Sequence, residues 1–150
     1  MTQHPDNHRK LWLEKLVNDN NFTLGAELGV HEGVTHFHLL DRCPQLAMIG
    51  VDRYGGNQAR YWRPVEKKLA SYGLRCRFYK EETVKASKNI GTNELDFVFI
   101  DADHSYEGCL SDIKAWFPKV RSGGYITGHD CELPAVKKAI VEFFGAGGYK

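Results

Sequence analysis

The chain has 150 residues, of which 42% are hydrophobic and 26% charged, and its formal net charge is +1. This length suffices for one domain with a buried core, and the composition is that of a globular protein rather than a disordered one. A charge so close to neutral makes nucleic acid an unlikely partner, and no apolar stretch is long enough for a membrane helix or a signal peptide, so we expect a cytoplasmic protein without a membrane partner.

Short apolar runs alternate with longer amphipathic runs along the whole chain. Helices are marked by apolar residues one turn apart, such as Leu13 and Val17, and strands by short runs rich in apolar residues. Pro64 implies a kink or a later start for the third helix. In chain order the pattern predicts helix 8–20, strand 22–29, helix 33–40, strand 47–52, helix 57–73, strand 74–80, helix 81–89, strand 95–101, helix 105–117, strand 125–130 and helix 134–145.

This alternation predicts an α/β fold, a Rossmann-like doubly wound parallel sheet, in a single domain over residues 1–150. The strands are apolar on both faces, as in sheets covered by helices on both sides. Such sheets bind ligands beyond the carboxyl ends of their strands. Functional residues are therefore expected directly after each strand.

The segment after the first strand, AELGVHEGVT, contains Gly29 and Gly33, which allow a tight turn and close approach of the backbone to a ligand. The helix that follows offers amides suited to an anionic group. Glu27 at the strand end could accept from an ammonium, and His31 within the turn would face the ligand. The segment is also compatible with a plain strand–turn–helix connection. It contains no G-x-G-x-x-G, which disfavours a dinucleotide site.

Acidic residues follow three further strands. Asp52 lies 23 residues beyond Gly29, the distance at which a carboxylate binds ribose hydroxyls in nucleoside-binding α/β folds. Asp101 and Asp130 follow the fourth and fifth strands. If those strands are neighbours, the two carboxylates converge and can hold a divalent cation, or can perturb each other and a nearby histidine. In the same stretch, Asp103 or Ser105 could simply cap the next helix.

Other polar and aromatic residues carry weaker signals. His36 and His38 are expected to be surface or packed residues of a helix, and His4 and His8 to be terminal and solvated. The widely spaced cysteines form no CxxC pair and are expected to be reduced thiols rather than a zinc site or a disulfide framework. Three aromatics in the loop and helix after the second strand could line an acceptor pocket or belong to the core: Tyr54, Tyr61 and Trp62.

Four motifs together resemble one family. ELGVHEGVT, IGVD, LDFVFIDADHSYEG and SGGYITGHD, which span about residues 22–145, are similar to class I S-adenosylmethionine-dependent methyltransferases, and most of all to small-molecule O-methyltransferases of the catechol and caffeoyl-CoA type and related bacterial enzymes. The resemblance implies S-adenosylmethionine as cofactor and a small-molecule acceptor. The implied cofactor-binding residues are Glu27, Gly29, His31, Gly33, Thr35, Asp52, Glu82 and Asp101.

The resemblance also implies roles for these positions. Glu27 and the glycine turn would hold the methionine part, with Thr35 near its carboxylate, and Asp52 would bind the ribose. Glu82 would lie near the adenine, and Asp101 beside the sulfonium. In metal-dependent relatives Asp101 and Asp130 would be the metal ligands, for Mg²⁺ or Mn²⁺.

The chain departs from the family pattern in two places. Cys131 follows Asp130 where catechol-type enzymes have Asn, and a thiol is a poor ligand for a hard cation. Either Asp103, His104 or His129 completes a metal site, or no metal is used and a histidine is the base. The sequence also ends where the family's C-terminal β-hairpin would begin, so we expect an uncovered edge beside the fifth strand, which leaves a homodimer among the expected forms.

The predicted function is O-methylation of a small hydroxylated molecule by in-line transfer. The expected catalytic residues are Asp101, His104 and His129, with His or metal-assisted removal of the acceptor proton. A partner-dependent or non-catalytic S-adenosylmethionine-binding module is the alternative. A nicotinamide-dependent oxidoreductase is a third class, disfavoured by the missing glycine motif.

Overall fold

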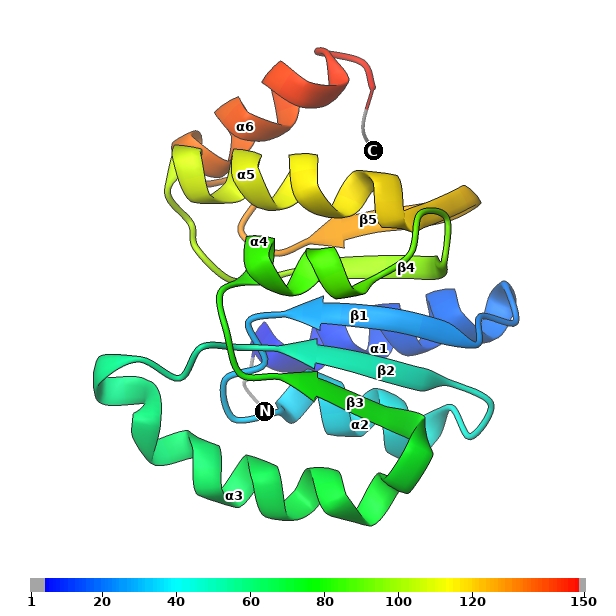
Figure 1. Ribbon diagram of the computed structural model, residues 1–150. Helices are drawn as coiled ribbons and strands as arrows, with labels where there is room; N and C mark the ends of the chain where they lie inside the picture. Colours follow the sequence, from blue (N-terminus) through cyan, green and yellow to red (C-terminus); the bar gives the residue numbers. More distant parts are fainter. Residues whose placement is uncertain (1–4, 149–150) are drawn as a thin grey trace.

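A computed structural model describes residues 5–148 and contains one five-stranded sheet in the order β3-β2-β1-β4-β5 (Figure 1). Every pair of neighbouring strands is parallel. The predicted α/β sheet is therefore confirmed, with its strand order reversing between β1 and β4. The strands are β1 Leu24–Leu28, β2 Ala47–Val51, β3 Cys76–Tyr79, β4 Leu95–Ile100 and β5 Val120–Gly128.

Helices cover both faces of the sheet, which explains why the central strands carry apolar residues on both faces. One face packs on α1 Pro5–Asp19, α2 Val34–Arg42 and α3 Ala59–Leu69, through a core that includes Leu13, Leu40 and Phe97. The other face packs on α4 Thr83–Ala86, α5 Tyr106–Trp116 and α6 Pro134–Phe144, through a core that includes Val98 and Trp116. All six residues of β4, which lies between β1 and β5, are buried.

The register of the sheet places the carboxyl ends of β1, β2, β4 and β5 side by side. Leu28 pairs with Val51 on one side and with Ile100 on the other, and Ile100 pairs with Gly128. The segments that follow β1, β2, β4 and β5 therefore leave the sheet at one edge. This edge is where a parallel sheet places its ligands.

Four local predictions need correction. The third helix runs from Ala59 to Leu69, so it starts two residues later and ends four residues earlier than predicted, and it contains Pro64 in its second turn. Leu74 is fully exposed in the 3₁₀ segment Ala70–Arg75 instead of belonging to β3. The fifth helix ends at Trp116, one residue before its predicted end, and Phe117 is about half exposed and packs on Phe143 and Phe144. The fifth strand starts earlier, at Val120.

β5 is an outer strand of the sheet, and within residues 5–148 it pairs only with β4. An outer strand offers unpaired backbone groups, so the homodimer expected from this edge stays a prediction. In the same range, no helix is long and apolar enough to cross a membrane.

Candidate active site

A cavity of about 810 Å³ opens at the carboxyl ends of the strands. Its size is within the range of roughly 300–1,000 Å³ that is usual for small-molecule sites. Seven of the eight residues predicted to bind the cofactor line it: Glu27, Gly29, His31, Thr35, Asp52, Glu82 and Asp101. The eighth, Gly33, does not line this cavity.

Acidic side chains dominate the wall of the cavity. Two guanidinium groups, of Arg9 and Arg53, lie among carboxylates from the ends of β1 to β4. This excess of negative charge favours a cationic ligand. The carboxylates belong to Glu27, Glu32, Asp52, Glu81, Glu82, Asp101 and Asp103.

The glycine turn after β1 brings two backbone segments together. Gly29 has φ +87°, and a Cβ at this position would lie 2.0 Å from the carbonyl oxygen of Asp101. Gly33, with φ +77°, precedes α2, where a Cβ would lie 2.3 Å from the ring of Phe37. Gly29 therefore shapes the cavity floor. Gly33 serves the packing of α2, and its contact with a cofactor stays a prediction.

Asp52 ties the loop after β2 to the loop after β1. Its Oδ2 accepts from the amide of His31 at 2.9 Å, and its Oδ1 accepts from the amide of Tyr54 at 2.8 Å. The Tyr54 hydroxyl donates to the carbonyl of His31 at 2.8 Å. Of the three aromatics in this region, Tyr54 is buried in the core, and Tyr61 and Trp62 pack against it. The ring of Tyr61 also contacts that of His31 in a tilted arrangement, at 4.4 Å between ring centroids.

Glu27 is buried at the end of β1 and contacts a residue that the sequence did not single out as functional. His36 on α2 is fully buried, and its Nδ1 lies 3.0 Å from Oε2 of Glu27. Burial raises the pKa of Glu27. For His36, burial alone would lower the pKa, but hydrogen bonds with Cys76 and Glu27 raise it to about 9. His36 is therefore the cation of the pair at neutral pH.

Arg9 on α1 is a second contributor that the sequence did not reveal. Its Nη1 donates to Oδ2 of Asp101 at 2.5 Å, and both side chains are mostly buried. The N-terminal helix thus provides a charged group that lies directly on a predicted catalytic carboxylate. The pairing joins residues that are 92 positions apart, so it could not be read from local sequence.

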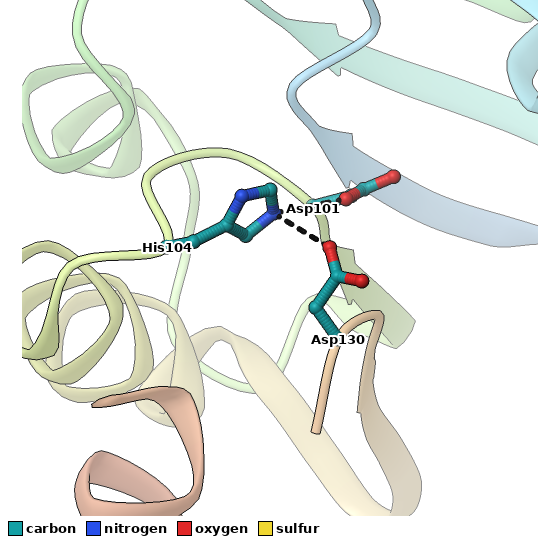
Figure 2. Close-up of side chains that lie close together, drawn as sticks. All are labelled: Asp101, His104 and Asp130. Carbon is teal, nitrogen blue, oxygen red and sulfur yellow. Dashed lines mark hydrogen bonds and ion pairs between the residues drawn. The ribbon is translucent and has the colours of Figure 1, made fainter. Parts of the chain in front are cut away.

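Asp101, His104 and Asp130 converge at the adjacent ends of β4 and β5 (Figure 2). Nε2 of His104 lies 3.3 Å from Oδ1 of Asp101 and 3.1 Å from Oδ2 of Asp130. His129 joins from the side, with Nδ1 3.0 Å from Oδ1 of Asp130 and 4.0 Å from Asp101. Asp130 has φ +56°, a left-handed conformation that few residues other than glycine adopt, and it is held in this conformation at the edge of the site.

The rest of the acidic stretch after β4 has a structural role. Ser105 caps α5 by accepting from the amide of Gly108 at 3.1 Å. Asp103 accepts from the amide of Ser105 at 2.8 Å, and this hydrogen bond lowers the pKa of Asp103. Ser105 is therefore the N-cap, whereas Asp101 and His104 belong to the cluster.

The segment that carries Glu82 is held in place by hydrogen bonds with α5, one of them with the buried Asp112. Thr83 lines the cavity, and its hydroxyl makes a short hydrogen bond with Asp112 of α5. Asp112 is 2% exposed, and burial raises its pKa to about 6. The indole of Trp116 donates to the carbonyl of Thr83 at 3.1 Å. Two residues of α5 therefore fix this wall of the cavity.

The cluster partly fits a divalent metal. One ligand atom from each of Asp101, His104 and Asp130 lies within 4.8 Å of the others, which gives two oxygens and one imidazole nitrogen. Mn²⁺ accepts such a mixed set more readily than Mg²⁺, which prefers oxygen alone. Arg9 already balances one carboxylate charge of the set. Cys131 is exposed and stands outside the group.

Comparison with known proteins agrees with this geometry. A family model described as a methyltransferase domain matches residues 26–131, which include the end of β1, the glycine turn and the strand-end acids through Asp130. The chain belongs to this methyltransferase family. A curated relative, an uncharacterized protein of Acanthamoeba polyphaga mimivirus, is 34% identical over 65 residues, covering 38% of this chain and 29% of that protein. The chain thus spans under a third of the length of this relative.

Solved structures share the whole fold of this methyltransferase at low sequence identity. A proposed caffeoyl-CoA O-methyltransferase from Staphylococcus aureus superposes with a TM-score of 0.76 at 13% identity, covering 100% of this chain and 78% of that one. A proposed O-methyltransferase from Klebsiella pneumoniae gives 0.74 at 16% identity, covering 97% and 71%. A Podospora anserina methyltransferase, solved with S-adenosylhomocysteine bound, gives 0.66 at 14% identity, covering 96% and 68%.

Proposed function

We propose that this methyltransferase domain transfers the methyl group of S-adenosylmethionine to an oxygen of a small hydroxylated molecule. The observation that carries the proposal is the position of Asp101, which lines the cavity and also contacts His104 beside Asp130. The methyl group of a donor bound in the cavity would lie next to side chains that can take the acceptor's proton. Two of the fold neighbours, described as proposed O-methyltransferases, support oxygen as the acceptor atom.

The charge of the cavity suits the methionine end of the cofactor. Its ammonium and sulfonium are cations, and the carboxylates of Glu27 and Asp101 lie on this wall. The methionine carboxylate would meet the first turn of α2, where no side chain of residues 5–148 caps the amides and where Thr35 lines the cavity. Each end of the methionine moiety thus has a partner of opposite charge.

The nucleoside end has its own partners on β2 and the segment after β3. Each oxygen of Asp52 accepts one backbone amide and keeps a further lone pair for a ribose hydroxyl. Those two amides hold the carboxylate still before the ligand arrives. Glu82 and Thr83 form the wall on which the adenine would lie.

Transfer breaks the carbon–sulfur bond of the sulfonium and forms a carbon–oxygen bond to the acceptor, leaving a neutral thioether. The protein has to align donor and acceptor and take up the acceptor's proton. His104 and His129 each direct one ring nitrogen at a carboxylate, so the other nitrogen can accept the proton. The carboxylate then stabilises the imidazolium that forms, which is the usual purpose of such a pair.

A metal would act at the same position. If the cluster of Asp101, His104 and Asp130 holds Mn²⁺ or Mg²⁺, the ion supplies a Lewis acid that lowers the pKa of an acceptor hydroxyl. His104 contacts both Asp101 and Asp130, so the three side chains are already gathered at this position. Comparing turnover in chelator with turnover in added Mn²⁺ separates the two routes.

Calorimetric titration with S-adenosylmethionine and with NAD tests the cofactor. We expect binding of the first only, and tight NAD binding alone would refute the proposal. Release of S-adenosylhomocysteine across a panel of phenols and other hydroxylated acceptors tests the reaction. Asp101→Asn and Asp130→Asn should each lower turnover by about 10²-fold or more. Asp19→Asn, at an exposed position of α1, is the matched control. Unchanged turnover in both site variants would refute the catalytic assignment.

A partner-dependent cofactor module is a second candidate, favoured by the open acceptor side. His104 is 44% exposed and His129 36% exposed, so a further chain could cover the cluster and complete an acceptor pocket. This reading predicts S-adenosylmethionine binding by the isolated chain with turnover only after the second chain is added. Turnover by the isolated chain would exclude it.

A further inference from the structure

A row of three polar side chains runs from β3 to the cavity: Glu27, which the proposed function assigns to the cofactor, and His36 and Cys76, which it does not use. Cys76 comes from β3, His36 from α2 and Glu27 from β1. Nε2 of His36 lies 3.3 Å from the sulfur of Cys76, and Nδ1 lies 3.0 Å from Oε2 of Glu27. The row ends at the cavity, because Glu27 lines its wall.

The ring of His36 is fixed by the packing around it. A Cβ at Gly50 of β2 would lie 3.0 Å from Cε1 of the ring, so β2 approaches the imidazole closely. The ring of Phe37 stands edge-on to it at 5.9 Å between centroids. His36 is 0% exposed, so water cannot replace either of its partners. Its orientation is set by the fold and not by solvent.

Both ring nitrogens face acceptors, which is the arrangement that an imidazolium with two N–H donors satisfies. A carboxylate buried as deeply as that of Glu27 would otherwise take up a proton rather than stay charged. The other charged groups that act on Glu27 are Arg9 of α1 and Asp101 after β4, and their effects on its pKa are opposite in sign. His36 is therefore the main source of positive charge beside this carboxylate.

We propose that His36 is a positioning residue for the cofactor: it holds the buried Glu27 carboxylate in place and negatively charged, so that Glu27 can bind the cofactor's ammonium. Cys76 fixes the far side of the ring. The inference rests on the proposed function, since it assigns Glu27 to the cofactor. The new residue is His36, which does not line the cavity and affects cofactor binding only through Glu27.

The test is the dissociation constant of S-adenosylmethionine, measured by calorimetry between pH 6 and 8. His36→Leu removes both donors, and His36→Asn keeps a neutral donor near the Nδ1 position. We expect His36→Leu to weaken binding by about tenfold or more, because it removes a charged hydrogen bond from Glu27. The loss should grow as the pH is lowered, since burial raises the pKa of Glu27 and without the imidazolium this carboxylate takes up a proton more readily.

Two controls separate this effect from general damage. His38→Leu changes the histidine two positions along α2, which binds Glu14 at 2.7 Å outside the cavity, and should leave both affinity and pH profile unchanged. Glu27→Gln should bind weakly at every pH, because it has no charge to lose. His36→Asn should be intermediate in affinity and weaken toward pH 6. It also covers the case in which His36→Leu does not fold.

The outcomes distinguish this inference from the proposed function. If the wild-type chain does not bind S-adenosylmethionine, the proposed function fails. If wild type binds and Glu27→Gln weakens binding, but the folded His36 variants keep the wild-type affinity and pH profile, only the role of His36 is overturned. A uniform loss in His36→Leu and His36→Asn with no dependence on pH would likewise overturn it, because a merely structural role gives that result.

Discussion

Asp112 offers a direct test of how α5 supports the cavity wall. The residue is buried and bonded to Thr83, and burial raises its pKa from 3.8 to about 6. Because the folded chain binds this proton more tightly than the unfolded chain, the free energy of unfolding falls as the pH rises from about 4 to 6. One pKa unit corresponds to about 1.4 kcal/mol, so ionisation of Asp112 costs the native state about 3 kcal/mol by pH 7.

Asp112→Asn keeps the shape and an oxygen acceptor for Thr83 but cannot ionise. Urea denaturation at intervals from pH 4 to 8 should show wild type losing roughly 2–3 kcal/mol relative to the variant across this range. Asp96→Asn is the control of opposite sign, since the amides of Thr23 and Leu24 and the side chain of Arg121 lower the pKa of Asp96 despite its burial. The stabilisation that ionised Asp96 gives the folded chain is present above the ordinary carboxyl pKa and is lost as the pH falls. Parallel curves for wild type and Asp112→Asn would refute the reasoning.

Two further predictions concern helix ends and helix packing. Ser105→Ala removes the side-chain oxygen that accepts from the amide of Gly108 and should lower the free energy of unfolding by about 1 kcal/mol in the same urea assay. Ser111→Ala, on the exposed face of α5, should lower it far less. Equal losses in the two variants would contradict the capping role. Leu13→Ala, at a fully buried position of α1, should lower the free energy of unfolding by about 2–5 kcal/mol. Leu11→Ala, at a 54% exposed position, should leave it nearly unchanged. An unchanged stability in Leu13→Ala would mean that α1 does not pack on the sheet as described.

Much of the fold could be predicted because the strands are apolar on both faces. A run such as LDFVFI can be buried throughout only in a sheet covered on both sides, and that sheet brings its strand ends to one edge. The convergence of Asp101 with Asp130 follows from this rule once β4 and β5 are neighbours. The cap at Ser105 is local, and a local pattern revealed it as one of two candidates.

The rest of the site depends on contacts between distant segments. Arg9 meets Asp101 only because of how α1 packs against the other elements, which no local pattern encodes. His36 looked like an ordinary helix residue, and only the positions of β1 and β3 place it between a carboxylate and a thiol. In the sequence, Asp112 resembles a solvent-facing acid on a helix, and only the folded structure shows that it is buried beside the cavity wall.

The central position of β1 has a consequence for the synthesis of the chain. β1 pairs with β2, which follows it soon, and with β4, which comes much later. A chain leaves the ribosome N-terminus first, so Glu27 and Asp52 are made well before Asp101 exists to face them. Until β4 emerges, one edge of β1 is open to other strands, and the nascent chain holds only part of the cavity wall. The stretch made before β4 therefore depends for its folding on its own core or on chaperones.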